Sequence, residues 1–220
     1  MPDTAILDVD GTLVDTNYQH ALAWYRAFRR FDLTLPVWRL HRAIGMGGDQ
    51  LVPAVAGEEF EAAHGDAARD AWTEEFDPLL PEVRPFDGAR DLLVELGRRG
   101  WTVVLASSGQ PQHVDAFLDL LDARDVVAGW TTSQDAESTK PAPDLLQAAL
   151  QQVSGHAGVV LGDSAWDCEA AQNASMPSVA VRTGGFSVEE LTGAGAGSVF
   201  DSLRELLEGL DGTEFARPSR

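Results

Sequence analysis

The chain has 220 residues, of which 44% are hydrophobic and 23% are charged, so by composition it is an ordinary globular protein. This length suffices for one domain, or for a core domain that carries a smaller second one. With 16 Lys and Arg against 35 Asp and Glu, the formal net charge is -19, which argues strongly against nucleic acids and anionic membranes as partners. An anionic substrate must therefore meet a local positive site.

The single cysteine, Cys168, excludes an internal disulfide and fits a reducing compartment. No leader with a basic and then an apolar stretch precedes Asp3. No apolar run approaches the roughly 20 residues that a membrane-spanning helix needs. We therefore expect a soluble, cytoplasmic protein, and we expect it to be a monomer or a weak dimer.

A short apolar run at residues 5–7 stops at two carboxylates, Asp8 and Asp10. The run shows no alternation, which favours a strand that is buried on both faces of a parallel sheet. In open α/β sheets the ligand crevice lies outside the carboxyl ends of the strands. If the chain stays extended, residues two apart point to the same side, so both carboxylates reach one pocket and repel each other. A divalent metal would relieve this repulsion.

Gly11 and Thr12 continue this stretch. The glycine lets the backbone turn sharply and approach a ligand closely, and the threonine offers a hydroxyl and an amide to an anion. An ordinary Asp-Gly turn between two strands is the alternative that this stretch alone leaves open.

The next part of the chain has the pattern of an all-helical insertion. Asp15 or Thr16 is a plausible N-cap for a first helix, because apolar residues then recur at spacings of three and four. The further segments are a break at residues 33–36, a helix at 38–44, a flexible joint at 45–48, a helix from about Asp49, a helix at 58–76, and a return marked by Pro78, Pro81 and Pro85. We predict a four-helix cap at residues 16–82, inserted into a core formed by residues 1–15 and 83–220.

From Asp87 onward, helical and strand patterns alternate. Helices are predicted at residues 89–99, 110–121, 143–153 and 202–210, and strands at 101–106, 126–131, 158–162, 179–181 and, at an edge, 199–200. This alternation predicts an α/β fold with a Rossmann-like parallel sheet and right-handed crossovers. We expect residues 212–220 to form a frayed tail.

Polar residues follow the strands of this predicted sheet in a consistent way. They are Asp8 and Asp10 after the first strand, Ser107 and Ser108 after the second, Lys140 at a helix start after the third, and Asp163 with Asp167 after the fourth. The crossover rule brings these strand ends to one edge of the sheet. Taken singly, Ser107 could be a helix N-cap and Lys140 an exposed lysine at a helix start.

Together these residues resemble the haloacid dehalogenase superfamily of aspartyl-phosphate hydrolases. The resemblance covers residues 4–201. Within the superfamily, it is more specifically a resemblance to the phosphoglycolate phosphatase-like and β-phosphoglucomutase-like members, which carry a helical cap of the C1 type. The matching stretches are residues 8–13 for the first motif, Ser107 for the second, Lys140-Pro141 for the third, and residues 162–164 with Asp167 for the fourth.

The resemblance implies a role for each of these residues. Asp8 attacks phosphorus, and Asp10 protonates the leaving oxygen and later activates water. Mg²⁺ is held by the Asp8 carboxylate, the Asp10 carbonyl and Asp163, and Asp167 supports this metal site.

The resemblance also implies a phosphate site at the second and third motifs. Ser107 and the amides near Asp10, Gly11 and Ser108 bind phosphoryl oxygens, with Thr12 and Gly109 beside them, and Lys140 offsets the charge of Asp8 and phosphate. In the cap, Gly45, Met46 and Gly47 are the candidates for contact with substrate, and Arg39 or Arg42 is the alternative guide for an anion. The five histidines show no metal-ligand spacing.

We therefore predict a Mg²⁺-dependent phosphatase that acts on a small phosphorylated metabolite through an aspartyl-phosphate. A β-phosphoglucomutase-like sugar-phosphate mutase is one alternative, although the arginine that the resemblance leads us to expect just beyond Gly45 is missing. A receiver-like signalling domain that accepts phosphate on an aspartate is another. The helical insertion and the paired aspartates speak against that second alternative.

Overall fold

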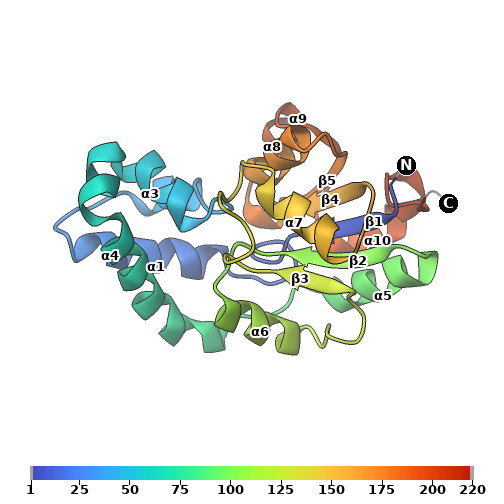
Figure 1. Ribbon diagram of the computed structural model, residues 1–220, viewed down its shortest axis with the longest axis horizontal. Helices are drawn as coiled ribbons and strands as arrows, with labels where there is room; N and C mark the ends of the chain where they lie inside the picture. Colours follow the sequence, from blue (N-terminus) through green and yellow to red (C-terminus); the bar gives the residue numbers. More distant parts are fainter. Residues whose placement is uncertain (1, 219–220) are drawn as a thin grey trace.

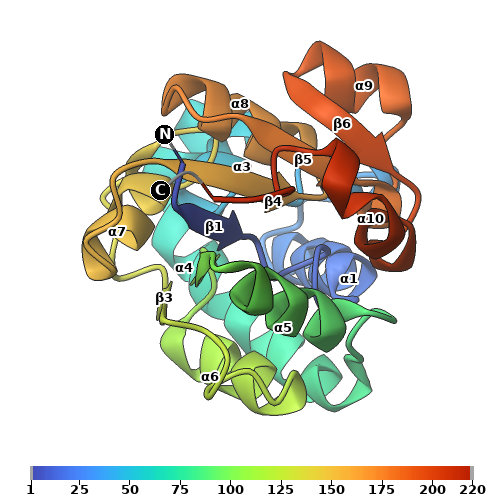
Figure 2. The same cartoon turned by 90° about the vertical axis from the view of Figure 1, so that its right-hand side faces the viewer.

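The computed structural model describes residues 2–218, and its centre is a six-stranded parallel sheet in the order β3-β2-β1-β4-β5-β6 (Figures 1 and 2). The strands are β1 (Thr4–Leu7), β2 (Thr102–Ala106), β3 (Gly129–Thr131), β4 (Gly158–Gly162), β5 (Ser178–Val181) and β6 (Ala196–Phe200). The predicted α/β class and parallel sheet are confirmed.

The apolar run that precedes Asp8 forms a central strand with both faces covered. Ala5 and Leu7 pack in one hydrophobic cluster, whereas Ile6 points into a second cluster on the opposite face, and all three side chains are fully buried. β1 pairs in parallel with both β2 and β4, so that Leu7 lies opposite Leu105 and Leu161. The carboxyl ends of these three strands therefore lie side by side.

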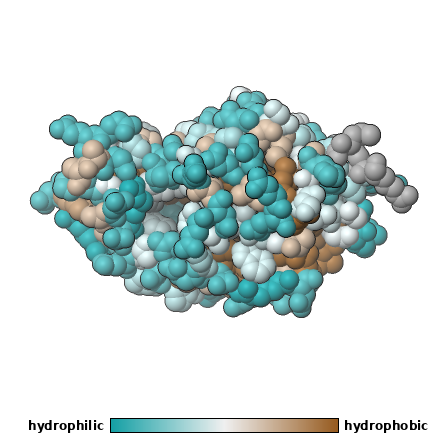
Figure 3. Space-filling view, in the orientation of Figure 1, coloured by the Kyte–Doolittle hydropathy of each residue, from teal (hydrophilic) through white to brown (hydrophobic). Residues whose placement is uncertain are grey.

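Helices cover both faces of the sheet (Figure 2). They are α5 (Ala89–Arg99), α6 (Pro111–Leu120), α7 (Asp144–Gln152), α8 (Ala165–Asn173), α9 (Val188–Gly193) and α10 (Leu203–Gly209), with short 3₁₀ turns η2 (Arg182–Gly184) and η3 (Leu210–Gly212). Within residues 2–218, no helix has the length and apolar character to cross a membrane. The face shown in Figure 3 is mostly hydrophilic, as the acidic composition predicts.

Helices α8 and α9 have no counterpart in the predicted elements. Both begin at capping boxes, in which Ser164 and Asp167, or Ser187 and Glu190, exchange hydrogen bonds between side chain and backbone. The buried face of α8 consists of small and polar residues, and α9 has only six residues. Neither helix therefore shows the periodic apolar stripe on which the prediction depended.

The insertion between β1 and β2 is helical, as predicted, and lies at one end of the molecule (Figure 1). It contains α1 (Asn17–Arg29), α2 (Val37–His41), α3 (Gly48–Ala56) and α4 (Glu58–Phe76), followed by the 3₁₀ helix η1 (Asp77–Glu82). A separate hydrophobic cluster around Trp24, Phe28 and Leu51 holds these helices together. The domain limits at residues 15 and 82 stay a prediction.

The expectation of a frayed C-terminal tail is wrong for much of the segment at 212–218. Phe215 is fully buried in the main cluster of the sheet. Its ring meets Trp101 edge-on at 5.8 Å between centroids, and Trp101 Nε1 donates a hydrogen bond to the Phe215 carbonyl oxygen at 3.1 Å. An aromatic residue in an otherwise polar tail was the signal for this docking. Residues 219–220 lie outside the described part of the chain.

Candidate active site

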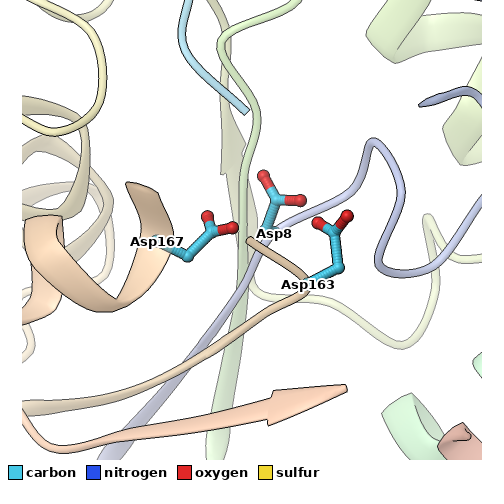
Figure 4. A group of neighbouring side chains, drawn as sticks. All are labelled: Asp8, Asp163 and Asp167. Atoms are coloured by element: carbon cyan, nitrogen blue, oxygen red, sulfur yellow. The ribbon is translucent and has the colours of Figure 1, made fainter. Parts of the chain in front are cut away.

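Three carboxylates converge at the carboxyl ends of β1 and β4. Asp8 directly follows β1, Asp163 directly follows β4, and Asp167 lies in the first turn of α8. Their side chains point toward one another (Figure 4), and one oxygen from each lies within 4.8 Å of the others. All three residues are buried. The predicted meeting of these strand ends is therefore observed.

Lys140 is the cation of this cluster. Its ammonium Nζ forms ion pairs with Asp8 and, at 2.6 Å, with Asp167 Oδ1. Burial alone would lower the pKa of Lys140, but the charges of Asp167 and Asp8 raise it above its ordinary value. The residue is 1% exposed, so the alternative of an exposed lysine at a helix start is wrong.

Thr12 and Asn17 orient two of the carboxylates. The Thr12 hydroxyl lies 2.9 Å from Asp8 Oδ2 and 3.0 Å from Asp163 Oδ1. Asn17 Nδ2, in the first turn of α1, donates to Asp163 Oδ2 at 3.0 Å. The hydroxyl of Thr12 thus faces carboxylates, and its contact with a phosphoryl oxygen stays a prediction. Asn17 is a site residue that was not predicted from the sequence.

Gly11 is required by the closeness of this packing. Its φ is +82°, and a Cβ at this position would lie 2.4 Å from Asp163 Oδ2 and from Asn17 Nδ2. Its amide donates to the Val14 carbonyl at 2.8 Å, which closes the turn after Asp10. Any side chain here would therefore force the turn, Asn17 or Asp163 to shift, and so disturb the hydrogen bond between Asn17 and Asp163.

The carboxylate of Asp10 lies outside this cluster and has its own partners. Oδ1 accepts a hydrogen bond from Thr16 Oγ1 at 3.1 Å and lies 2.8 Å from His20 Nε2, while Oδ2 accepts from Ser107 Oγ at 3.2 Å. Burial alone would raise the pKa of Asp10, but the contacts with His20, Thr16 and Ser107 hold it below its ordinary value. A role of the Asp10 carbonyl in metal binding stays a prediction.

Thr16 and His20 therefore connect the helical insertion to the site. Thr16 precedes α1 as its predicted N-cap, but its side chain makes no capping bond and serves Asp10 instead. The His20 ring stacks on Phe76 at 4.3 Å and on Trp72 at 5.5 Å between centroids. The histidines show no metal-ligand spacing in the sequence, and no other role was predicted for them. The signal for His20 was its position in the first turns of a helix that starts beside Asp10.

The second predicted motif forms a tight turn after β2. Ser107 is fully buried, and its Oγ accepts the Gly109 amide at 2.9 Å while it donates to Asp10. The alternative reading of Ser107 as a helix N-cap is wrong, because α6 begins at Pro111 and Gln110 is its N-cap.

A cavity of about 290 Å³ lies between the helical insertion and this edge of the sheet. It brings together residues that were predicted separately from the core and from the insertion: Asp8, Asp10, Ser108, Gly109, Gly45, Met46 and Gly47. In the part of the chain that the structure describes, neither Arg39 nor Arg42 lines it. Arg42 instead pairs with Glu190 at 2.5 Å and lies 3.8 Å above the ring of Phe186.

The joint at residues 45–48 touches the core closely. A Cβ on Gly45 would lie 2.5 Å from Ser164 Oγ, and one on Gly47 would lie 2.4 Å from Thr139 Oγ1. The Gly47 amide donates to Thr139 Oγ1 at 3.0 Å. Glycine at these positions thus allows the joint to rest on the residues that precede Lys140 and follow Asp163.

The charges of the cluster fit a divalent cation. Three buried carboxylates face one ammonium, so the group carries excess negative charge when all are ionised. Burial, assisted by the charge of Asp167, raises the pKa of Asp163 to about 7, and burial raises that of Asp8 well above its ordinary value against the opposing effect of Lys140. Mg²⁺ prefers hard oxygen ligands such as these carboxylates, and its positive charge would offset the cost of ionising several carboxylates in a buried group.

Comparison with known proteins agrees with this arrangement. The model of the haloacid dehalogenase-like hydrolase family matches residues 2–175. Validoxylamine A 7'-phosphate phosphatase from Streptomyces hygroscopicus subsp. limoneus is 26% identical over 148 residues, 66% of this chain and 68% of its own length. Phosphoglycolate phosphatase from Caulobacter vibrioides is 27% identical over 210 residues, 92% of this chain and 88% of its own length. The crystal structure of a hydrolase from Pseudomonas syringae is 29% identical, with a TM-score of 0.89 over 95% of this chain and 98% of that one.

Proposed function

The chain belongs to the haloacid dehalogenase-like hydrolases, and on this premise we propose that it hydrolyses small phosphomonoesters through an aspartyl-phosphate on Asp8, with Mg²⁺ as cofactor. One observation carries the proposal: the Asp8 carboxylate, held by Lys140 and Thr12, lines the same cavity as the second carboxylate of Asp10. Two relatives that are named as phosphatases of phosphorylated small molecules support it.

In the first step, an oxygen of Asp8 attacks phosphorus and the bond from phosphorus to the leaving oxygen breaks. The leaving oxygen takes a proton from Asp10. His20 Nε2 lies 2.8 Å from Asp10 Oδ1, so a protonated His20 ring is placed to give Asp10 the proton that Asp10 then passes to the leaving oxygen. Such a donor is useful because the contacts with His20, Thr16 and Ser107 hold the pKa of Asp10 below its ordinary value and so favour its carboxylate form.

In the second step, Asp10 as carboxylate takes a proton from water, and the water oxygen attacks the phosphorus of the aspartyl-phosphate. The bond between phosphorus and Asp8 breaks, which releases inorganic phosphate and restores the Asp8 carboxylate. The backbone at Ser108 and Gly109 borders the cavity and is available for the phosphoryl oxygens, while Ser107 holds the turn and Asp10 in place.

Asp8 and Asp163 would hold Mg²⁺, with Asp167 beside them. A bound Mg²⁺ supplies positive charge that neutralises the phosphoryl oxygens and the carboxylates. Thr12 and Asn17 keep the two ligating carboxylates oriented. Asp167 shares Lys140 with Asp8, so it keeps the ammonium at the nucleophile.

The proposal extends to the organisation and setting of the protein. Residues 16–82 would act as a cap that closes over the core and limits bulk water in the cavity. The substrate would be a small phosphorylated metabolite, and the protein would act in the cytoplasm as a monomer or weak dimer. Membership of a hydrolase family argues against the receiver-like alternative.

Steady-state release of inorganic phosphate from p-nitrophenyl phosphate tests the proposal. With Mg²⁺, we expect many turnovers per protein molecule and none for Asp8→Asn. A sugar-phosphate mutase would instead interconvert glucose 1-phosphate and glucose 6-phosphate with little phosphate release. A single stoichiometric phosphorylation without turnover would contradict both enzymatic readings.

A further inference from the structure

The cap side of the cavity holds one strongly basic side chain, and that side chain is already paired. Among the described residues that line the cavity, Arg69 is the one Lys or Arg. Its Nη1 donates to Glu61 Oε2 at 3.0 Å and to the Gly48 carbonyl at 3.2 Å, and its Nη2 donates to Glu61 Oε1 at 2.9 Å and to Asp66 Oδ1 at 2.8 Å. Two carboxylates therefore offset the charge of Arg69, and both terminal nitrogens are in use.

Two acidic residues border the same cavity outside the reacting carboxylates. Asp49 lines it from α3, and Glu137 lines it from the loop that precedes Lys140. Glu137 is exposed and makes no hydrogen bond or ion pair with another described residue. Both groups repel a substrate that carries a second negative charge beyond its phosphate.

Among the described residues of the cap wall, His20 is turned to Asp10, and a further feature that could attract an anion is the amino end of α3. This nine-residue helix begins at Gly48, beside the cavity, and the amino end of a helix carries a partial positive charge. Asp49 is the acid in its first turn. The Asp49 carboxylate accepts hydrogen bonds from the Thr139 amide and hydroxyl, which fixes it at this end of the helix. Its charge thus counteracts the attraction of the helix for an anion.

Apolar side chains complete the cap wall, namely Trp24, Ile44, Met46 and Trp72. These groups offer contact to carbon and none of them offers a cation. We infer that this cavity selects phosphomonoesters whose leaving group is uncharged or cationic, and that Asp49 and Glu137 reject leaving groups that carry a carboxylate or a second phosphate. The inference rests on the proposed phosphatase activity.

Three esters with a two-carbon leaving group test the inference: ethanolamine phosphate, 2-hydroxyethyl phosphate and 2-phosphoglycolate. They end in an ammonium, a hydroxyl and a carboxylate, respectively, so their charge varies at nearly constant size. We expect kcat/KM for 2-phosphoglycolate to lie about tenfold or more below that for the other two, from like-charge repulsion in a partly desolvated cavity. p-Nitrophenyl phosphate serves as the reference substrate.

Two variants locate the effect. Asp49→Asn and Glu137→Gln should each raise kcat/KM for 2-phosphoglycolate relative to 2-hydroxyethyl phosphate by several-fold, roughly the effect of one screened charge. Glu137→Gln breaks no bond between described residues, so it tests the charge even if Asp49→Asn disturbs the contact with Thr139. Glu59→Gln, an equal change of charge on an exposed part of α4 outside the cavity wall, should leave the ratio unchanged.

The outcomes separate the inference from the proposed function. Hydrolysis of 2-phosphoglycolate as fast as 2-hydroxyethyl phosphate would overturn the inference while the phosphatase function stands. The expected order with unchanged ratios in both variants would overturn the assignment to Asp49 and Glu137. No hydrolysis of any ester, p-nitrophenyl phosphate included, would overturn the proposed function and the inference with it.

Discussion

The two walls of the cavity are built in different ways. On the sheet side, Asp8, Lys140 and Asp163 are ionisable and buried, and they contact one another or Thr12 beside the strand ends. On the cap side, the described wall consists mainly of glycines and apolar side chains, and its one arginine, Arg69, forms an ion pair with Glu61. On our proposal, the groups for chemistry lie mainly at the sheet edge, and most groups that contact the leaving group lie on the insertion, with Glu137 of the core beside them.

This difference predicts how substitutions on each wall act. A change on the sheet side removes a reacting group or leaves a buried charge without its partner, so its effect should be large and similar for all substrates. A change on the cap side alters how the leaving group is held, so its effect should be smaller and depend on the substrate. Four experiments test this difference between the two walls.

Replacement of the nucleophile should have the largest effect. We expect Asp8→Asn to lower kcat by about 10³-fold or more for every phosphomonoester, because an amide is a poor nucleophile and a weak ligand for Mg²⁺. Phosphate release and circular dichroism measure activity and folding in the same samples. Activity within tenfold of the wild type, in a folded variant, would remove Asp8 from the mechanism.

Removal of the metal should have the next largest effect. EDTA should abolish turnover of all esters, and Mg²⁺ should restore it, because excess buried carboxylate otherwise repels the phosphate. Because Mg²⁺ should bind the folded state and not the unfolded state, adding Mg²⁺ should also raise the melting temperature. That rise should vanish in Asp163→Asn and persist in Asp66→Asn, an exposed acid outside the carboxylate cluster. Full activity after exhaustive chelation would contradict the metal site.

Sequence patterns predicted the sheet wall far better than the cap wall. The two-sided burial of β1 follows from its unbroken apolar run, and parallel topology then places Asp8 and Asp163 together. Ser107 and Lys140 were predicted as site residues from the family resemblance. Their local sequence alone does not show whether they are buried in a site or lie at a helix start.

Other contacts depend on how elements pack, and the sequence patterns do not describe that packing. Asn17 and His20 reach the site because α1 starts beside Asp10, and the contact of Arg69 with the Gly48 carbonyl appears only once α3 and α4 are placed against each other. Likewise, the C-terminal segment packs on the core through the single buried ring of Phe215, and one aromatic residue forms no periodic pattern from which this packing could be predicted.

His20 belongs to the insertion but contacts Asp10 on the sheet side, so a substitution there tests whether the two walls have separate roles. We expect His20→Asn to lower kcat/KM by about 10²-fold for alkyl phosphates, whose leaving oxygen needs a proton, and much less for p-nitrophenyl phosphate, whose leaving group departs as an anion. His64→Asn, at an exposed position on α4, is the matched control and should change neither. Equal losses for both ester types would assign His20 a structural role.

The contact between the joint and the core should give the smallest effect. In Gly47→Ala the new methyl group would lie 2.4 Å from Thr139 Oγ1, so the joint and the Thr139 side chain must move apart. Because this contact joins the cap to the core without touching the reacting carboxylates, we expect KM to rise a few-fold, by an amount that differs among esters, and kcat to change little.

Gly97→Ala, within α5 and with no neighbour within 4 Å of the new Cβ, is the control and should leave KM unchanged while it stabilises the fold by about 0.5–1 kcal/mol. A uniform loss of kcat in Gly47→Ala would mean that the joint also positions Lys140 through Thr139, and the separation between the two walls would then be wrong at this point.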